Sequence, residues 1–228
     1  MRPDRLLKHA AGIAVVWLGS QLAHRVRFGI SDAIPSDGPV IIVANHLTTT
    51  EPLAVARLVL GHRRFPHFLA MREVFSWPVI GWLARGTGQI PVARGTASAA
   101  EALAGASEQL AAGRVVALYP EGRLTDAPDQ MPGPGRTGAA RLALLHPAVP
   151  VIPVGTWGPK QGRAHRWHRH TACLCVGEPV DLSAYAGRTD ERAAQEATAV
   201  IMAAIRAQVV RAQGEYRRQR RLAALQAH

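Results

Sequence analysis

The chain has 228 residues, of which 48% are hydrophobic, so it is long and apolar enough to bury the core of one large domain. This composition excludes an intrinsically disordered chain. The formal net charge of +11 at pH 7 favours an anionic partner, namely a nucleic acid, a membrane surface or a phosphorylated substrate.

Residues 1–28 predict an N-terminal helix. The apolar stretch of residues 10–23 is interrupted by Gly12 and Gly19 and is shorter than the ~20 residues that a membrane-spanning helix needs. It also lacks a clear signal-peptide cleavage site. Two interpretations stay open: an amphipathic helix bearing Trp17 that lies on a membrane, or a helix that packs on the domain as part of its core. We assign residues 1–28 as a membrane-associating helix.

Residues 29–186 predict a single α/β domain. Its strands are expected at residues 39–45, 67–71, 88–94, 114–120, 149–155 and 171–177, and its helices at residues 52–60, 77–85, 97–112 and 137–146. Nearly continuous apolar strands separated by helices are typical of a mostly parallel central sheet flanked by helices on both faces. Sites on such sheets lie beyond the carboxyl ends of the strands, here after Asn45, Tyr119 and Val154.

Two cysteines, Cys173 and Cys175, alternate with apolar residues in the last expected strand. One intervening residue is too few for a disulfide framework or the usual zinc pair. We expect buried, unreactive thiols in a reducing compartment.

Residues 187–228 predict a long C-terminal helix with a basic tail. Its apolar stripe includes Ala197, Ile201 and Ile205, and arginines concentrate in residues 211–221. The tail is either an ordinary solvated surface or a surface attracted to anionic lipid, at about 1 kcal/mol per basic residue near the bilayer.

His46 is the first candidate for chemistry, because it follows a buried strand and lies in a polar loop. A histidine there can act as a general base near neutral pH if a carboxylate orients its other ring nitrogen. Glu51 is five residues on, and residues five apart on a helix do not share a face, so contact between them requires a turn. Alternatively, His46 caps a strand and Glu51 only favours a helix start at Pro52.

A second candidate region follows Tyr119. Glu121 and Gly122 predict a tight turn, in which glycine permits a left-handed backbone or close approach of a ligand. Arg123 beside them is suited to bidentate binding of phosphate. Arg94, just past an earlier strand, is a weaker candidate for holding an anion.

Four motifs in order resemble the glycerophospholipid acyltransferase family, whose best-known members are the lysophosphatidate (1-acylglycerol-3-phosphate) acyltransferases. They are Asn-His-x4-acidic-Pro at residues 45–52, Gly-x-Ile-Pro-Val-x-Arg at 88–94, Tyr-Pro-Glu-Gly at 119–122 and Val-Ile-Pro-Val at 151–154. The resemblance spans about half of the chain and is strongest to the bacterial branch.

The resemblance implies direct acyl transfer from acyl-CoA or an acyl carrier protein thioester to a lysophospholipid, most simply 1-acylglycerol-3-phosphate giving phosphatidate. His46 corresponds to the family's general base and Glu51 to its orienting acid. Arg94 and the stretch Glu121, Gly122 and Arg123 correspond to the acceptor-phosphate site, and Pro153 to the proline of the fourth motif. No cofactor is implied beyond the thioester co-substrate.

The chain departs from the family at two positions. Aspartate is usual where Glu51 stands, so we expect Glu51→Asp to keep or raise activity and Glu51→Gln to lose most of it. The family's third motif often reads Glu-Gly-Thr-Arg, whereas Arg123 here takes the place of the threonine. The alternatives are therefore a different lysolipid acceptor or a catalytically weak lipid-binding homologue.

The remaining expectations concern partners and metals. We expect a peripheral or monotopic protein at the cytoplasmic face of the cell membrane, with an anionic membrane surface and substrates as partners and acyl carrier protein as an alternative donor carrier. Nucleic-acid binding is disfavoured because no recognised motif accompanies the charge. His165, His168 and His170 lie close together without carboxylates, so we expect an exposed basic connection and no metal.

Overall fold

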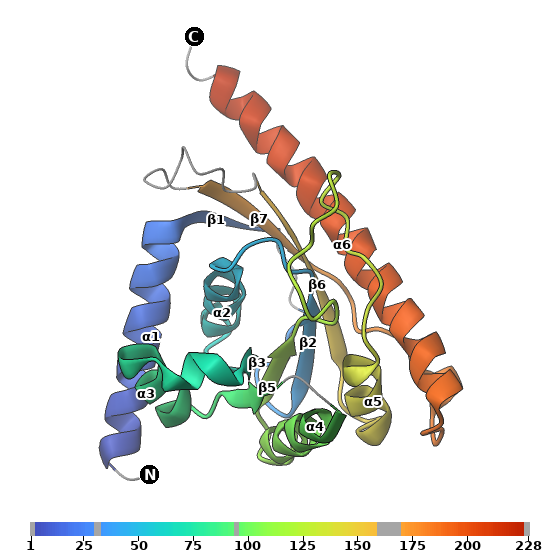
Figure 1. The fold of residues 1–228 in the computed structure, drawn as a ribbon. Helices are drawn as coiled ribbons and strands as arrows, with labels where there is room; N and C mark the ends of the chain where they lie inside the picture. The colour runs from blue at the N-terminus through green and yellow to red at the C-terminus, as the bar shows by residue number, and fades with distance from the viewer. Residues whose placement is uncertain (1–2, 30–32, 94–95, 159–169, 226–228) are drawn as a thin grey trace.

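The computed structural model describes residues 3–29, 33–93, 96–158 and 170–225. In this part of the chain, seven strands form one sheet in the order β1-β7-β6-β2-β5-β3-β4 (Figure 1). The strands are β1 (His24–Gly29), β2 (Val40–Ala44), β3 (Pro66–Met71), β4 (Ile90–Val92), β5 (Val115–Leu118), β6 (Val151–Trp157) and β7 (His170–Val176).

The sheet is mostly parallel, as predicted. β2 lies between β5 and β6 and runs parallel to both, and β3 and β4 continue the parallel part. Among the described strands, only β6 and β7 pair antiparallel, and β1 then pairs parallel to β7 at the edge. All six expected strands are present. β1 was not expected, because it interleaves basic residues with apolar ones and ends in glycine.

Helices cover both faces of the sheet (Figure 1). α4, α5 and α6 contribute to one buried cluster, and α2 contributes to the cluster on the opposite face. The α-helices are α1 (Pro3–Ala23), α2 (Glu51–Gly61), α3 (Pro78–Gly86), α4 (Thr96–Ala111), α5 (Gly138–Leu145) and α6 (Glu191–Leu225), with short 3₁₀ helices η1 (Arg72–Ser76) and η3 (Ser183–Tyr185).

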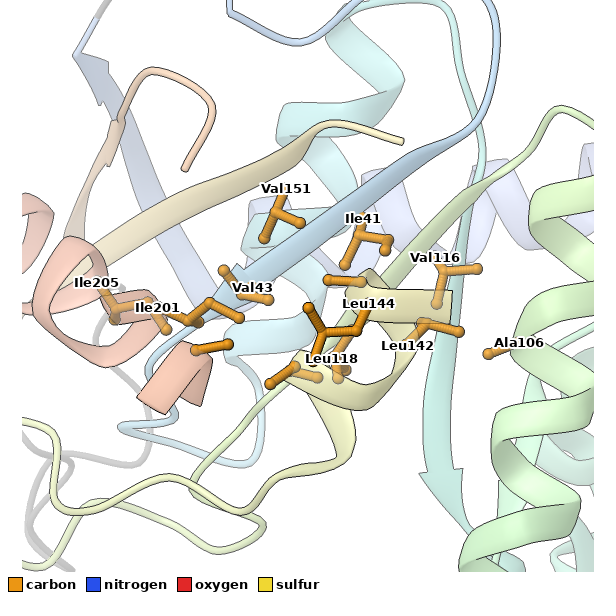
Figure 2. Packing of buried hydrophobic residues seen from close by; sticks show 14 of the residues in the cluster. Ile41, Val43, Ala106, Val116, Leu118, Leu142, Leu144, Val151, Ile201 and Ile205 are labelled. Atoms are coloured by element: carbon orange, nitrogen blue, oxygen red, sulfur yellow. The ribbon is translucent and has the colours of Figure 1, made fainter. Parts of the chain in front are cut away.

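The larger core cluster fills the space between the sheet and α4, α5 and α6. Figure 2 shows Ile41, Val43 and Val116 of the sheet facing Leu142 of α5 and Ile201 of α6. The long helix lies directly on β6: a Cβ at Gly155 would come within 2.1 Å of the α6 backbone. Only glycine permits this approach, and it seats the predicted C-terminal helix against the centre of the sheet.

The fully buried β2 strand positions the candidate site. Every residue of Val40–Ala44 is buried, as a central parallel strand requires. Because its neighbours β5 and β6 run in the same direction, the three loops after Asn45, Leu118 and Trp157 begin at the same edge of the sheet. The strand ends near Asn45 and Tyr119 therefore lie at one edge as predicted, whereas the loop expected after Val154 was wrongly placed, because β6 continues to Trp157.

The N-terminal helix α1 packs on the domain with one face and exposes apolar side chains on another. Gly12 lies against the side chains of Phe65 and Thr87, and Gly19 lies against Leu53, so one face packs on the domain. Trp17 and Leu18 are more than half exposed on another face. No helix within the described ranges is long and apolar enough to cross a membrane.

The two cysteines are buried and free in β7, as predicted. His165 and His168 of the histidine cluster lie outside the described residues, as does Arg94. Within the part of the chain that is described, no group of three His, Cys, Asp or Glu side chains is arranged to hold a metal ion.

Candidate active site

His46 lies just beyond the carboxyl end of β2, in the turn that leads to α2. The turn is closed by hydrogen bonds from the Glu51 amide to the Thr48 carbonyl, at 3.3 Å, and from the Leu53 amide to the Thr50 carbonyl, at 3.1 Å. α2 then begins at Glu51, with Pro52 in its first turn. The backbone between His46 and Glu51 is therefore a turn, which is what contact across this spacing requires.

Glu51 is 4% exposed, and its carboxylate faces His46. Its Oε2 atom lies 3.7 Å from Nδ1 of His46, which is electrostatic contact but longer than a hydrogen bond. The same oxygen accepts hydrogen bonds from the amides of Leu47 and Thr48. Such distances are often long in a ligand-free enzyme and shorten when substrate binds.

The second carboxylate oxygen of Glu51 has a partner far away in the sequence. Oε1 accepts a hydrogen bond from the hydroxyl of Thr156, near the end of β6. Thr156 is itself held by Asn45, whose side chain accepts from the Thr156 amide at 2.8 Å and donates to the Thr156 carbonyl at 3.1 Å. The Asn45 side chain thus extends the β2–β6 ladder by one residue.

The surroundings of Glu51 act on its charge in opposite directions. Burial raises the pKa of Glu51 above its ordinary value of 4.5, and the adjacent His46 and the Leu47 and Thr48 amides offset part of this increase. The hydrogen-bond donors around the Glu51 carboxylate therefore offset part of the free-energy cost of burying its charge beside His46.

Glu121 connects the loop after β5 to the main chain of His46. Its Oε1 accepts from the His46 amide at 3.2 Å and from the Thr125 hydroxyl at 2.8 Å, and its Oε2 accepts from the Gly133 amide at 3.0 Å. The Thr125 amide in turn donates to the His46 carbonyl at 2.6 Å. The carboxylate of Glu121 therefore binds donors of the chain itself and holds the loop to His46.

Tyr119 sets the plane of the His46 ring. The two rings stack with centroids 4.2 Å apart and planes 19° from parallel, and Phe68 lies beyond Tyr119 at 6.3 Å. Burial, followed by the nearby negative charge of Glu51, raises the pKa of Tyr119 well above its ordinary value, so its hydroxyl stays neutral. His46 is thus held by stacking on one ring face as well as through its backbone.

Exposed basic residues form the rim of the site. Gly122 has a φ of +65°, so it adopts the left-handed conformation that was one of the two alternatives predicted for it. The side chain of Arg136 lies over Gly122, where a Cβ would come within 2.8 Å of its Nε atom. The Arg123 side chain is 61% exposed and lies 3.8 Å from Asp126.

The sequence of the chain matches a known protein family. A family model described as Acyltransferase matches residues 25–157, more than half of the chain. The chain belongs to this acyltransferase family. The family resemblance drawn from the four motifs is therefore confirmed.

Two curated relatives of this acyltransferase come from distant organisms. The chain is 34% identical over 117 residues to a lyso-ornithine lipid O-acyltransferase of Pseudomonas aeruginosa, covering 51% of this chain and 42% of the relative. It is 29% identical over 131 residues to the chloroplastic 1-acyl-sn-glycerol-3-phosphate acyltransferase BAT2 of Brassica napus, covering 57% of this chain and 36% of the relative. The acyltransferase thus matches less than half the length of these relatives.

A solved structure has the same fold. The crystal structure of the 1-acyl-sn-glycerophosphate (LPA) acyltransferase PlsC of Thermotoga maritima is similar with a TM-score of 0.64 and 25% sequence identity. The match covers 91% of this chain and 82% of that chain. The predicted α/β fold class is therefore confirmed for this acyltransferase.

Pro153, one of the predicted site residues, lies apart from this group. Pro153 pairs with Val43 inside the sheet, and its carbonyl accepts from the Gly177 amide at 2.9 Å. Because alternate residues of a strand face opposite sides, Pro153 points to the α6 face, whereas Ile152 and Val154 face α2. Arg94 lies outside the described residues, so its predicted role in the site stays a prediction.

Sequence reasoning missed the partners that hold the predicted pair. Thr156 lies two residues beyond the fourth motif, in the region where a loop was expected to contribute to the site. The residue type gave no signal, because a threonine in a β-rich run is common. Tyr119 and Thr125 were equally inconspicuous, since their roles depend on contacts with a residue more than 70 positions away.

Proposed function

We propose that this acyltransferase moves a fatty acyl group from an acyl thioester to the free hydroxyl of a lysolipid, with His46 as general base. The observation that carries the proposal is the pairing of Nδ1 of His46 with the buried carboxylate of Glu51. This pairing favours the tautomer that carries its proton on Nδ1. Nε2 is then free to accept the proton of an acceptor hydroxyl.

The proposed reaction needs one base and no covalent intermediate. Nε2 of His46 takes the hydroxyl proton as the acceptor oxygen attacks the thioester carbonyl, and a tetrahedral intermediate forms. The C–S bond then breaks, and the imidazolium returns its proton to the departing thiolate. Direct transfer agrees with the state of the cysteines: Cys173 and Cys175 lie buried in β7, and burial raises the pKa of Cys175, the opposite of an activated nucleophile.

The acceptor is proposed to be 1-acylglycerol-3-phosphate, because Arg123 and Arg136 place positive charge on the rim of the site. A lyso-ornithine lipid is the second candidate. The name of the Pseudomonas relative favours it. The shifted arginine of the third motif, Arg123, also favours it, because Asp126 lies beside Arg123 and offsets its positive charge.

An acyl-transfer assay tests the proposal and separates the candidates. Purified protein is offered lysophosphatidate, lyso-ornithine lipid and other lysolipids, each with acyl-CoA and with acyl carrier protein thioesters, and the products are identified by mass spectrometry. We expect one acceptor to be preferred and His46→Ala to lose at least about a thousandfold in kcat. Near wild-type turnover by His46→Ala would exclude the proposed base.

We also propose that α1 and α3 rest on an anionic membrane, at the cytoplasmic face of the cell membrane. The two helices are in contact, and each exposes large apolar side chains, with tryptophans suited to the bilayer interface: Val15, Trp17, Leu18, Trp77, Val79, Ile80 and Trp82. Sedimentation with anionic vesicles tests this. Trp77→Ala/Trp82→Ala should bind several-fold more weakly than wild type, and Leu145→Ala, an exposed apolar residue of α5, should bind equally well.

A further inference from the structure

We propose that Thr156 is a positioning residue for the acyl-transfer reaction, and that its hydroxyl is the reason a glutamate serves at position 51. The hydroxyl holds Oε1 of Glu51, which leaves Oε2 facing Nδ1 of His46. The inference rests on the proposed function, because it concerns the orientation of the proposed base.

The two oxygens of Glu51 have different surroundings. Oε2 is held by the Leu47 and Thr48 amides and faces His46. Oε1 accepts from the hydroxyl of Thr156. Without that hydroxyl, one oxygen of a buried carboxylate would lose its hydrogen bond, which favours rotation or protonation of the group.

The protonation state of Glu51 decides which nitrogen of His46 is available. An ionised Glu51 accepts a proton from Nδ1 and leaves Nε2 as the base. A protonated Glu51 would donate to Nδ1 and move the imidazole proton to Nε2, where it blocks abstraction of the acceptor proton. The other titratable groups that face the pair, Glu121 and Tyr119, contact His46: Glu121 accepts from its amide, and Tyr119 stacks on its ring.

The position of Thr156 does not depend on its hydroxyl. Its backbone is bonded twice to the side chain of Asn45, and the rest of β6 pairs with β2 through residues 151–154. The hydroxyl is also 3.2 Å from Oδ1 of Asn45, but that oxygen already accepts from the Thr156 amide. A hydroxyl has one proton, and because Oδ1 of Asn45 already has the Thr156 amide as its donor, this proton is available to Oε1 of Glu51.

The Glu51 carboxylate has two anchors, the Leu47 and Thr48 amides on one oxygen and the Thr156 hydroxyl on the other. Reaching both anchors explains why the side chain is a glutamate and not the shorter aspartate. The carboxylate spans from the Leu47–Thr48 turn to β6. Aspartate would withdraw it by ~1.5 Å, one carbon–carbon bond, so it would lose one of the two anchors. We therefore expect Glu51→Asp to lower kcat, which revises the expectation drawn from the sequence alone.

Kinetics of matched variants test the proposal. Thr156→Val removes the hydroxyl with almost no change of shape, and we expect kcat to fall about 10- to 100-fold with KM for the acceptor unchanged. Thr156→Ser keeps the hydroxyl and should stay within about threefold of wild type. Thr156→Ala is the second hydroxyl-free variant, to be used if valine prevents folding as judged by thermal melting.

A double-mutant cycle separates positioning from a general structural role. In Glu51→Asp the carboxylate no longer reaches both anchors, so adding Thr156→Val should cost little more, and the two effects should not multiply. Wild-type kcat in both hydroxyl-free variants, or effects that multiply in the double variant, would overturn the proposal.

A spectroscopic measurement keeps this test independent of turnover. In protein with ¹⁵N-labelled histidine, with the His46 signal assigned from His46→Ala, we expect the proton of neutral His46 on Nδ1 in wild type and Thr156→Ser. Thr156→Val should shift protons to Nε2. An unchanged tautomer in Thr156→Val contradicts the role of Thr156. A wild type that acylates no lysolipid contradicts the proposed function instead, and the tautomer still decides the role of Thr156.

Discussion

The interior and the rim of the site differ in how firmly they are held. In the interior, Glu51 and Glu121 are about 5% exposed, and amides and hydroxyls of the protein donate hydrogen bonds to both carboxylates. At the rim, Arg123 is 61% exposed and meets only one acidic neighbour at 3.8 Å. Buried hydrogen bonds of this kind are strong and specific, whereas an exposed ion pair contributes little.

This difference indicates how the work of the site is divided. The interior orients one histidine and leaves little freedom for change, because any lost partner leaves a buried polar group unpaired. The rim is free to exchange residues without disturbing the fold. In the proposed reaction, the interior therefore holds the base and the exposed cations select the acceptor; the relatives are named for different lysolipids.

The largest expected effect on kcat comes from removing the negative charge of Glu51. Glu51→Gln keeps the shape of the side chain but supplies no negative charge to stabilise the His46 imidazolium. We expect kcat to fall roughly 10²- to 10⁴-fold, as for the neutral amide in a hydrolase triad. The measurement is kcat with the preferred acceptor. A loss below threefold would mean that the interior does not serve the base.

The second prediction tests whether the buried carboxylate of Glu121 stabilises the fold. Glu121→Gln places an amide N–H₂ against at least one of the donors His46 N, Thr125 Oγ1 or Gly133 N. We expect the free energy of unfolding to fall by about 1–3 kcal/mol and kcat to fall roughly tenfold as the His46 backbone loosens.

The matched control for Glu121→Gln is Glu101→Gln. Glu101 is exposed and pairs with Arg72 at 3.2 Å, so its loss should change the free energy of unfolding by less than about 1 kcal/mol. Urea unfolding of both variants gives the comparison. Equal free energies of unfolding for Glu121→Gln and Glu101→Gln would show that the Glu121 carboxylate does not stabilise the fold.

The third prediction concerns the pH dependence of stability. Burial raises the pKa of Glu51 in the folded protein, so the folded state binds this proton more tightly than the unfolded state does. The ionised group therefore costs stability as pH rises from about 4.5 through the raised folded pKa, and the cost is constant above it. Glu51→Gln should match wild type at acid pH and become more stable than it near neutral pH.

Thermal melting from pH 4 to pH 8 measures this difference. The glutamine introduced by Glu51→Gln still has an oxygen for the Leu47 amide and an N–H₂ for the Thr156 hydroxyl oxygen, so the substitution itself leaves no buried donor opposite a donor. If the melting temperature of wild type instead rose relative to that of Glu51→Gln with increasing pH, the prediction would be contradicted. That result would show that the neighbouring donors lower the pKa of Glu51 by more than burial raises it.

Sequence reasoning reached local features and stopped at contacts between distant segments. The turn between His46 and Glu51 was predictable because a buried strand, three threonines and Pro52 follow one another in the chain. The reach of Glu51 to Thr156 was not, because 105 residues separate them and only the β2–β6 pairing brings them together. For the same reason Glu121 and Arg123, near neighbours in sequence, were both assigned to the substrate, although one carboxylate is buried and one guanidinium is exposed.

The smallest expected effect belongs to the rim. Arg123→Ala should raise KM for an anionic acceptor about two- to fivefold and leave kcat unchanged, because an exposed cation contributes binding energy that is the same in ground and transition states. The effect should shrink as salt is added.

Arg192→Ala, which removes an exposed arginine paired with Glu196 on α6, is the matched control and should not change KM. Asp126→Ala should lower KM, since it frees Arg123 from its acidic neighbour. Equal KM values for Arg123→Ala, Arg192→Ala and wild type would remove Arg123 from the acceptor site and leave Arg136 as the described cation beside the Gly122 turn.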